Sequence, residues 1–342
     1  MKAKLAKLWR KTRRWLPGLL ISIVALVVVI RLASWHELAV AFEAVRPINL
    51  AAAVALTLIS LVTRALAWRV LLGNRTSIGK SFLVINEGYF LNNIFPLRAG
   101  EIGRALFMGK SSELGPFHVL STIVIERAFD VAMAAGLMLS TLPLALGMTW
   151  ARPVAIVTLI LVILGFIALF LMARNNDKVK VVIQRLGKRW PLIQRVVIPR
   201  IDALLDGLGA LTNPTQFLLA LLWIALSWGL WVLLYYVMLL PIAPHAPIWW
   251  AAFGDAVLAM GIAIPSAPSG LGVFEAALVG AFVLLGVSPS AALAYAIMMH
   301  FLQFVQTGII GFYGLTKEGR SLSSLLSDIR IKRQQEPAPD RH

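Results

Sequence analysis

The sequence predicts an all-α polytopic membrane protein with about six full spans and two re-entrant helical hairpins. Of its 342 residues, 59% are apolar and only 14% are charged, whereas soluble domains are about 45–50% apolar and about 25% charged. The mean hydropathy is +0.81. The apolar residues form runs long enough to cross a hydrocarbon core about 30 Å thick. An ordinary soluble globule is therefore excluded.

The apolar segments follow one another along nearly the whole chain. The first, at about 15–34, follows a 14-residue N-terminus that holds seven basic residues and no acid. No small-residue cleavage site follows it, so we expect an uncleaved first helix rather than a signal peptide. The further apolar segments lie at about 48–72, 78–96, 117–146, 153–173, 215–241, 247–264, 269–287 and 289–315.

Basic residues predict the orientation. Eight of them lie between 174 and 200, with Asp177 as the only acid there, and more follow in the tail at 317–342. The positive-inside rule places both termini and the linker at 174–213 in the cytoplasm, as for a multi-pass protein of a bacterial inner membrane. We expect 174–200 to lie on anionic inner-leaflet lipids, with a plain topology signal as the alternative. The formal charge of +16 does not indicate nucleic acid, because the basic residues lie at the ends of apolar segments.

Two segments must each enter and leave the membrane on the same side if both termini and the linker are to lie in the cytoplasm. They are 78–110, on the cytoplasmic side, and 247–287, on the outer side, and each contains helix breakers. The breakers are Pro96, Gly100, Pro265, Pro268, Gly270 and Gly272. Within one domain at 15–316, the units 48–146 and 215–315 then form an inverted repeat, whose broken segments indicate a transporter's binding site.

Ionisable residues in these segments need partners or water, because a charge at the bilayer centre costs about 2.5–3.5 kcal/mol. The candidate binding or translocation residues are Arg64, Asn92, Arg98, Glu101, Arg104, Glu126, Arg127, Asp130 and Glu275, with Glu87, Asp255, His300 and Gln303 as further candidates. We expect Arg98, Glu101, Glu126, Arg127, Asp130 and Glu275 to converge on one polar cavity. The alternatives are a structural ion pair for Arg127 and Asp130, an interfacial anchor for Arg104 and snorkelling for Arg64. Trp68, Trp223, Trp228 and Trp231 are expected to be packing residues.

No cofactor or metal site is expected. The chain has no cysteine and only five histidines, without a paired metal-ligand spacing. No Walker loop is present, so motifs give no support to ATP coupling within this chain.

Three motifs resemble a known family, the flippase-like membrane domain of bacterial lysylphosphatidylglycerol synthases. Residues 92–104, NNIFPLRAGEIGR, resemble its N-x-x-x-P-x-R-x-G-E-x-x-R signature. Glu126-Arg127 with Asp130 is similar to its E-R-x-x-D, and residues 265–275 are similar to its Pro-rich G-x-G-x-x-E signature.

The resemblance covers roughly residues 15–316 and implies a lipid translocase. Family members often carry a basic residue just before the last Glu, where this chain has Phe274. Only 26 residues follow position 316, which is too few for the family's soluble aminoacyl-transferase domain. The resemblance therefore implies the translocating part without the synthetic part.

Three function classes are compatible with these residues. The first is a lipid translocase for a polar or anionic headgroup, because arginines match phosphate bidentately and acids can meet an amine, a sugar hydroxyl or a proton. The second is an integral membrane headgroup transferase with Glu101 or Glu275 as general base, and the third is a scaffold for envelope-lipid enzymes that docks through 174–213. We expect the first, and no enzyme activity; the lipid, its energy coupling and the oligomeric state stay open.

Overall fold

The computed structural model describes residues 34–95, 98–146, 151–187, 201–263 and 267–318, with a few further positions at 20–31, 194 and 198. Over these residues the chain is helical and contains no strand. The elements are α3 (Trp35–Ala44), α4 (Pro47–Leu71), α5 (Ile78–Ile94), α6 (Ala99–Ser111), α7 (Pro116–Leu146), α8 (Ala151–Arg174), α9 (Asn176–Gly187), α10 (Ile201–Gly207), η3 (Leu208–Leu211), α11 (Pro214–Leu239), α12 (Ile248–Gly261), η4 (Pro268–Gly270), α13 (Val273–Leu284) and α14 (Pro289–Lys317). The expected breakers Pro96 and Pro265 lie outside the described residues.

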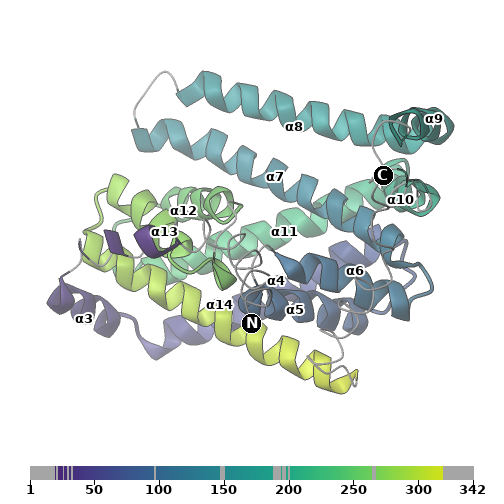
Figure 1. Ribbon diagram of the computed structural model, residues 1–342. Coiled ribbons are helices and arrows are strands. Elements are labelled where there is room, and N and C mark those ends of the chain that lie inside the picture. Colours follow the sequence, from purple (N-terminus) through teal and green to yellow (C-terminus); the bar gives the residue numbers. More distant parts are fainter. Residues whose placement is uncertain are drawn as a thin grey trace, which may run out of the picture.

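Four helices, α4, α7, α11 and α14, are long and apolar enough to cross a membrane. They coincide with four of the six expected spans, so the all-helical, multi-pass membrane fold is confirmed. Of the other two, the segment at 15–34 lies largely outside the described residues, and that at 153–173 forms α8, which lies beside α7 (Figure 1).

The long helices begin where the sequence signals a start. Each has a proline at its first position, where the missing N–H is not needed for the helix; these residues are Pro47, Pro116, Pro214 and Pro289. Asn213 also accepts hydrogen bonds from the backbone N–H groups of Thr215 and Gln216, and Ser288 accepts one from Ala291. The helix positions therefore follow from local capping chemistry.

Two pairs of short helices stand between the long ones. We call α5 with α6 the first short pair and α12 with α13 the second short pair. Their longest member, α5, has 17 residues, which extends only about 25 Å. Within the first pair, Gly88 and Gly100 permit very close approach, because a Cβ on Gly100 would lie 1.8 Å from the Gly88 carbonyl oxygen. Figure 1 shows α6 toward the end of the long helices near α9 and α10, and the second pair toward the opposite end.

The long helices α4 and α11 pack side by side at the centre and run antiparallel. The Asn49 side chain donates to the Val237 carbonyl, and the hydroxyl groups of Ser60 and Ser227 lie 2.9 Å apart. Residue numbers thus rise along α4 while their partners' numbers fall along α11. Around this central pair, α5 and α6 pack between α4 and α7, while α12 and α13 pack between α11 and α14.

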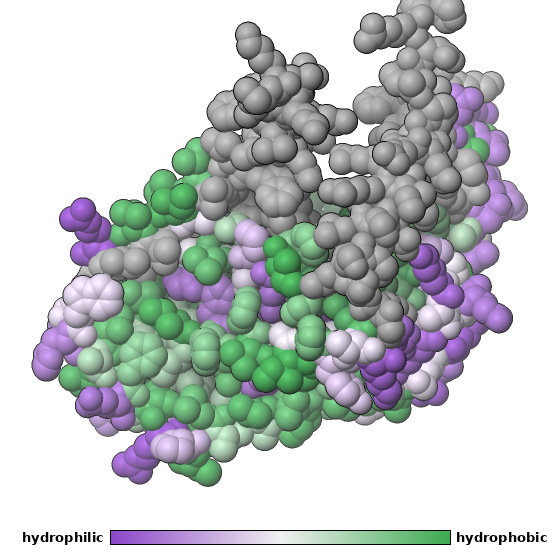
Figure 2. Space-filling model, turned by 60° about the horizontal axis from the view of Figure 1, so that its bottom comes forward, coloured by the Kyte–Doolittle hydropathy of each residue, from purple (hydrophilic) through white to green (hydrophobic). Residues whose placement is uncertain are grey.

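The outer surface is strongly apolar. Figure 2 shows a broad hydrophobic area across one face, with hydrophilic residues gathered toward its two ends. Large side chains such as Leu161, Leu222, Phe301 and Ile309 are more than half exposed. An apolar surface of this extent is far larger than a soluble monomer presents and is suited to contact with lipid.

Candidate functional site

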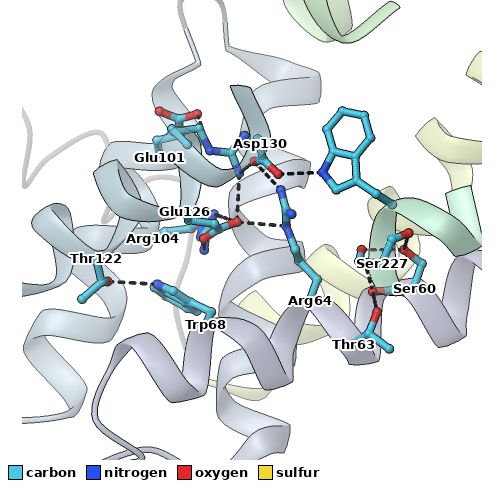
Figure 3. A network of polar contacts seen from close by, with 12 residues as sticks. Ser60, Thr63, Arg64, Trp68, Glu101, Arg104, Thr122, Glu126, Asp130 and Ser227 are labelled. Carbon is cyan, nitrogen blue, oxygen red and sulfur yellow. Dashed lines mark hydrogen bonds and ion pairs between the residues drawn. The ribbon is translucent and has the colours of Figure 1, made fainter. Parts of the chain in front are cut away.

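A carboxylate on α7 is the centre of a buried ionic network. Glu126 is fully buried, and its two oxygens bind three arginines from three helices (Figure 3). The distances are 3.0 Å to Arg64 Nε on α4, 2.6 Å to Arg104 Nη2 on α6 and 2.9 Å to Arg127 Nη2 on α7. The single carboxylate therefore holds α4, α6 and α7 together through charge-assisted hydrogen bonds.

Asp130, one helical turn further along α7, extends the network to α11. It accepts hydrogen bonds from Arg64 and, at 3.0 Å, from Arg127. The Trp228 indole N–H donates to its other oxygen at 3.1 Å. Arg64 thus points inward and does not snorkel, and Arg127 does form an ion pair with Asp130, as the alternative interpretation of these two residues predicted.

Arg104 is packed deep inside the first short pair. Only 1% of it is exposed, so the alternative of an interfacial anchor is wrong. Its guanidinium lies 4.2 Å from the centre of the Trp68 ring, whose indole N–H donates to Thr122 at 3.1 Å. A cation over an aromatic face is stabilised most when both are desolvated. A Cβ on Gly88 would lie 2.4 Å from Arg104 Cγ, so glycine makes room for this side chain.

Arg98 and Glu101 form the accessible rim of the network. Arg98 Nη1 lies 3.6 Å from Glu101 Oε1, and Arg127 Nε lies 3.9 Å from the same oxygen. Arg98 has a φ of 52°, a conformation that non-glycine residues rarely adopt and that concentrates at functional sites. Its guanidinium donates at 3.0 Å to the Ile262 carbonyl at the end of α12, where a cation complements the helix dipole.

Two cavities open onto this rim, with volumes of about 290 Å³ and about 340 Å³. Both are lined by Arg98, Glu101 and Arg127. The first cavity lies between the two short pairs and the second extends along α11 toward Asp255. The arrangement can bind an anion, because four arginines (Arg64, Arg98, Arg104 and Arg127) face three carboxylates (Glu101, Glu126 and Asp130) in the network. The residues left partly exposed at the rim are Arg98, Glu101 and Arg127.

The second unit holds a smaller polar cluster. His300 Nδ1 on α14 lies 2.6 Å from Glu275 Oε1, and His300 Nε2 lies 2.8 Å from the Ser269 hydroxyl. The Gly272 N–H donates at 2.6 Å to the other Glu275 oxygen, and the Phe274 ring stacks on the imidazole. Glu275 is buried and lines neither cavity, but Ser269 lines the first. Glu275 and Glu126 therefore lie behind the cavity walls rather than in them.

The other predicted residues have varied surroundings. Asn92 lines the first cavity and accepts the Gly100 N–H at 2.8 Å, which fixes the start of α6. Gln303 lines both cavities. Glu87 is buried beside Gly314. The Asp255 carboxylate lines the second cavity, and its Oδ2 atom has no hydrogen-bond partner among the described residues.

The predicted breakers of the second short pair shape its turn. Pro268 begins η4, while Gly270 and Gly272 have φ values of 76° and 84°. Ser269, between them, has a φ of 61°. A Cβ on Gly272 would lie 2.2 Å from the Ser22 carbonyl oxygen. Glycine is therefore required at this position by both conformation and close approach.

Sequence reasoning missed several polar contributors. Trp68 and Trp228 were expected to be packing residues, yet both donate indole hydrogen bonds within the network. For Trp68 a signal existed, since it lies four residues after Arg64 and so on the same helix face. Tyr89 and Ser269 line cavities, and no spacing in the sequence singles them out. The described residues contain no group of three or more acidic or histidine side chains suited to a metal ion.

Comparison with known proteins decides the family. The lysylphosphatidylglycerol synthase TM region family matches residues 15–311. The chain belongs to this family. Two UPF0104 membrane proteins of Methanothermobacter thermautotrophicus are each 26% identical to it. The match to one covers 92% of this chain and 96% of the relative, and the match to the other covers 73% of this chain and 78% of the relative. A UPF0104 membrane protein of Methanocaldococcus jannaschii is 27% identical over 66% of this chain and 93% of that protein.

No solved structure matches the chain. As a member of the lysylphosphatidylglycerol synthase TM region family, the protein carries its whole arginine–carboxylate network and the Glu275–His300 pair within the matched residues.

Proposed function

We propose that this membrane protein is a lipid translocase that moves a polar or anionic-headgroup lipid between leaflets. The observation that carries the proposal is the ionic network that opens onto two cavities through Arg98 and Arg127. A phosphodiester has one negative charge, and the network has one more arginine than carboxylates. Guanidinium groups bind phosphate oxygens bidentately. The headgroup phosphate therefore replaces water between the two rim arginines.

The buried and exposed arginines have separate roles. Arg98 and Arg127 have side chains that are 41% and 30% exposed, so they can contact a ligand. Arg64 and Arg104 are buried and hold Glu126 and Asp130 in place. The buried shell thus positions the rim, and Glu101 meets the rest of the headgroup. Such preorganisation avoids reorganising charges inside the membrane each time a lipid passes.

We further infer that the two short pairs are re-entrant hairpins of an inverted repeat. The contacts support this, because every packed pair in the unit α4–α7 has a counterpart in α11–α14, and α5 packs on α14 as α12 packs on α7. Ser60 and Ser227 meet at the same distance from the proline that begins each helix, and α4 and α11 are antiparallel. Inverted repeats provide alternating access to a site at their interface.

The inverted topology has a direct test, because the chain has no cysteine of its own. Single cysteines replace Ser112, near the first short pair, and Ala243, before the second. With six full spans and both termini cytoplasmic, an impermeant thiol reagent labels Ser112→Cys only from the cytoplasmic side and Ala243→Cys only from the outside. Labelling of both from one side contradicts the inverted repeat.

Helix α9 is proposed to lie on anionic lipids of the inner leaflet. It is amphipathic, with Lys178 and Arg185 exposed together with the apolar Val181 and Val182. Lys180 pairs with Asp202 of α10, and this hydrogen bond raises the pKa of the lysine. Each basic residue near an anionic surface contributes about 1 kcal/mol. Neutralising Lys178 and Arg185 is expected to slow lipid movement by the reconstituted protein in anionic but not in neutral liposomes.

Purified protein in liposomes tests the translocase directly. Phosphatidylglycerol with a fluorophore on one acyl chain is included, and a membrane-impermeant reductant quenches only the outer leaflet. Active protein makes the lipid of both leaflets accessible to the reductant. Arg127→Gln is expected to slow the quenching of inner-leaflet lipid at least tenfold. The matched control is the exposed Arg75→Gln, which is expected to keep full activity. Equal quenching in empty and protein-containing liposomes contradicts the proposal, and a new lipid species on chromatography favours a transferase.

A further inference from the structure

Two acid–base pairs occupy corresponding places in the two units. Glu101 and Glu275 are each the third residue of their helix, α6 and α13. Arg127 and His300 lie at the same distance from the prolines that begin α7 and α14. In each unit, then, a first-turn glutamate of the second short helix faces a basic residue on the following long helix.

The two pairs differ in chemistry. Arg127 Nε lies 3.9 Å from Glu101 Oε1, and arginine keeps its charge at every physiological pH. His300 Nδ1 lies only 2.6 Å from Glu275 Oε1, and histidine is the side chain that ordinarily changes charge between about pH 5 and 8. The second unit therefore contains a pair whose net charge can change, while the first unit does not.

We propose that His300, held by Glu275 and Ser269, is a proton-binding site that couples lipid translocation to proton movement; this inference rests on the proposed translocase. Ser269 lines the first cavity and is 2.8 Å from His300 Nε2, so it connects the buried imidazole with cavity water. In the neutral form, Nδ1–H donates to Glu275 and Nε2 accepts the Ser269 hydroxyl.

Proton uptake reverses one hydrogen bond in this chain. A proton from cavity water binds Nε2, which then donates to Ser269 Oγ, and the serine hydroxyl turns to Asn93 Oδ1, 3.4 Å away. Asn93 in turn donates to Thr307 at 3.0 Å. The switch therefore has an acceptor ready in each state. One N–H bond forms at Nε2 as one O–H bond of a hydronium ion in the cavity breaks, and no other covalent bond changes.

Binding of the proton changes the charge of the His300–Glu275 pair from −1 to 0. Phe274, next to Glu275, and Ser269 both line the cavity that Arg98 and Arg127 also line. Removal of a negative charge behind this wall favours an anionic headgroup in the cavity. Because linkage is reciprocal, the headgroup also favours the proton. The two are then carried together in the same direction.

Other titratable groups on the elements around α14 lie away from His300 or are engaged. The groups that face the imidazole are Glu275 of α13 and Ser269 of η4. Helix α3, with His36, Glu37 and Glu43, meets α14 near Ser290, through the Ser34 N–H. Arg64 of α4 binds Glu126 and Asp130. Glu87 of α5 lies beside Gly314, and the Tyr235 carbonyl of α11 accepts a hydrogen bond from Tyr295. Asp255 of α12 lines the second cavity.

Binding of a soluble headgroup tests the site without any transport. Glycerophosphoglycerol is suitable, because its phosphodiester does not titrate in the relevant range. Its affinity for the purified full-length protein is measured at about pH 5.5 and about pH 8, on either side of the ordinary histidine titration. We expect about tenfold tighter binding at the lower pH, within the usual range of coupling between sites.

Two substitutions at one position give opposite signatures. His300→Arg copies the permanent charge of Arg127, so it is expected to keep the tight affinity at both pH values. His300→Gln is expected to keep the weak affinity at both. The control is His245→Gln in the exposed loop before α12, which is expected to retain the wild-type pH dependence. A wild-type affinity that does not change with pH, or a pH dependence that survives in both His300 variants, overturns the proposal.

Liposomes with an imposed pH gradient test the coupling itself. Labelled phosphatidylglycerol is expected to move faster from the acidic to the alkaline side, and an internal pH dye is expected to report protons entering with it. If lipid moves at the same rate with and without the pH gradient, the coupling is overturned and the proposed translocase is not. Absence of lipid movement at equal pH instead overturns the proposed function. Faster movement toward the acidic side overturns carriage in the same direction.

Discussion

The units α4–α7 and α11–α14 share a framework but carry different charges. In the first, one buried glutamate binds three arginines, and a second acid extends the network to α11. In the second, the corresponding space holds the Glu275–His300 pair, a serine and a stacked phenylalanine. Similar helix packing therefore surrounds an arginine–carboxylate network in one unit and a histidine–glutamate pair in the other. The difference shows that the framework sets positions, whereas a few side chains set the chemistry.

The largest expected effect comes from the centre of the first unit. Glu126→Gln leaves Arg64, Arg104 and Arg127 with one carboxylate fewer inside a desolvated site. Removal of one partner from a buried ion pair costs about 3–5 kcal/mol. Denaturant unfolding in detergent is expected to show this loss, and lipid movement is expected to cease. The exposed Glu43→Gln is the matched control, with a change within about 0.5 kcal/mol. A stable Glu126→Gln protein contradicts the structural importance of the network.

The framework that the two units share was largely predictable from sequence. Long apolar runs with prolines at their starts gave all four clear spans to within about two residues, because hydropathy and capping are local properties. The short pairs were also located, since Gly100, Pro268 and Gly272 interrupt apolar segments. The spans and the breaks in the short pairs depend on residues that are close together in the sequence.

The contacts that define the site were less predictable. Arg104 looked compatible with an interfacial anchor, because only the packing of α6 against α5 and α7 shows that its side chain is buried and lies over Trp68 of α4. Glu275 was placed with the arginines, whereas its partner is His300, on the next helix. Tertiary packing decides which of several possible partners a charge meets, and one sequence without contacts does not contain that choice.

The glycines of the short pairs have very different surroundings, and the closest approach among them is at Gly100 in the first unit. In the first unit a Cβ on Gly100 would lie 1.8 Å from the Gly88 carbonyl, whereas in the second a Cβ on Gly280 would meet nothing within 4 Å. Overpacking costs about 1–3 kcal/mol, so Gly100→Ala is expected to be destabilised by at least this amount and to lose lipid movement. Gly280→Ala is expected to be neutral or stabilised by up to about 1 kcal/mol. Thermal unfolding of both variants separates close approach from general glycine flexibility.

A smaller effect is expected where the first unit contacts α11. Trp228→Phe removes the indole N–H that donates to Asp130 but preserves most of the ring. Because Asp130 keeps both arginines, we expect a loss of about 1.5 kcal/mol, the lower end for hydrogen bonds to charged groups. Trp231→Phe, at a neighbouring position with no indole hydrogen bond among the described contacts, is the control. Equal unfolding midpoints for the two variants contradict a role of Trp228 in the network.

The smallest expected effect tests the contact where the two units meet. Ser60 and Ser227 lie at corresponding positions of α4 and α11, with hydroxyl groups 2.9 Å apart and each also within reach of the other's backbone carbonyl. Replacing either by alanine is expected to cost about 0.5–1.5 kcal/mol. Because both single changes break the same mutual contact, the double variant is expected to be only slightly worse than either single one. A double-mutant cycle by thermal unfolding measures this. Fully additive losses indicate that the two serines act separately, and strongly unequal single losses indicate that the contact is not symmetric between the units.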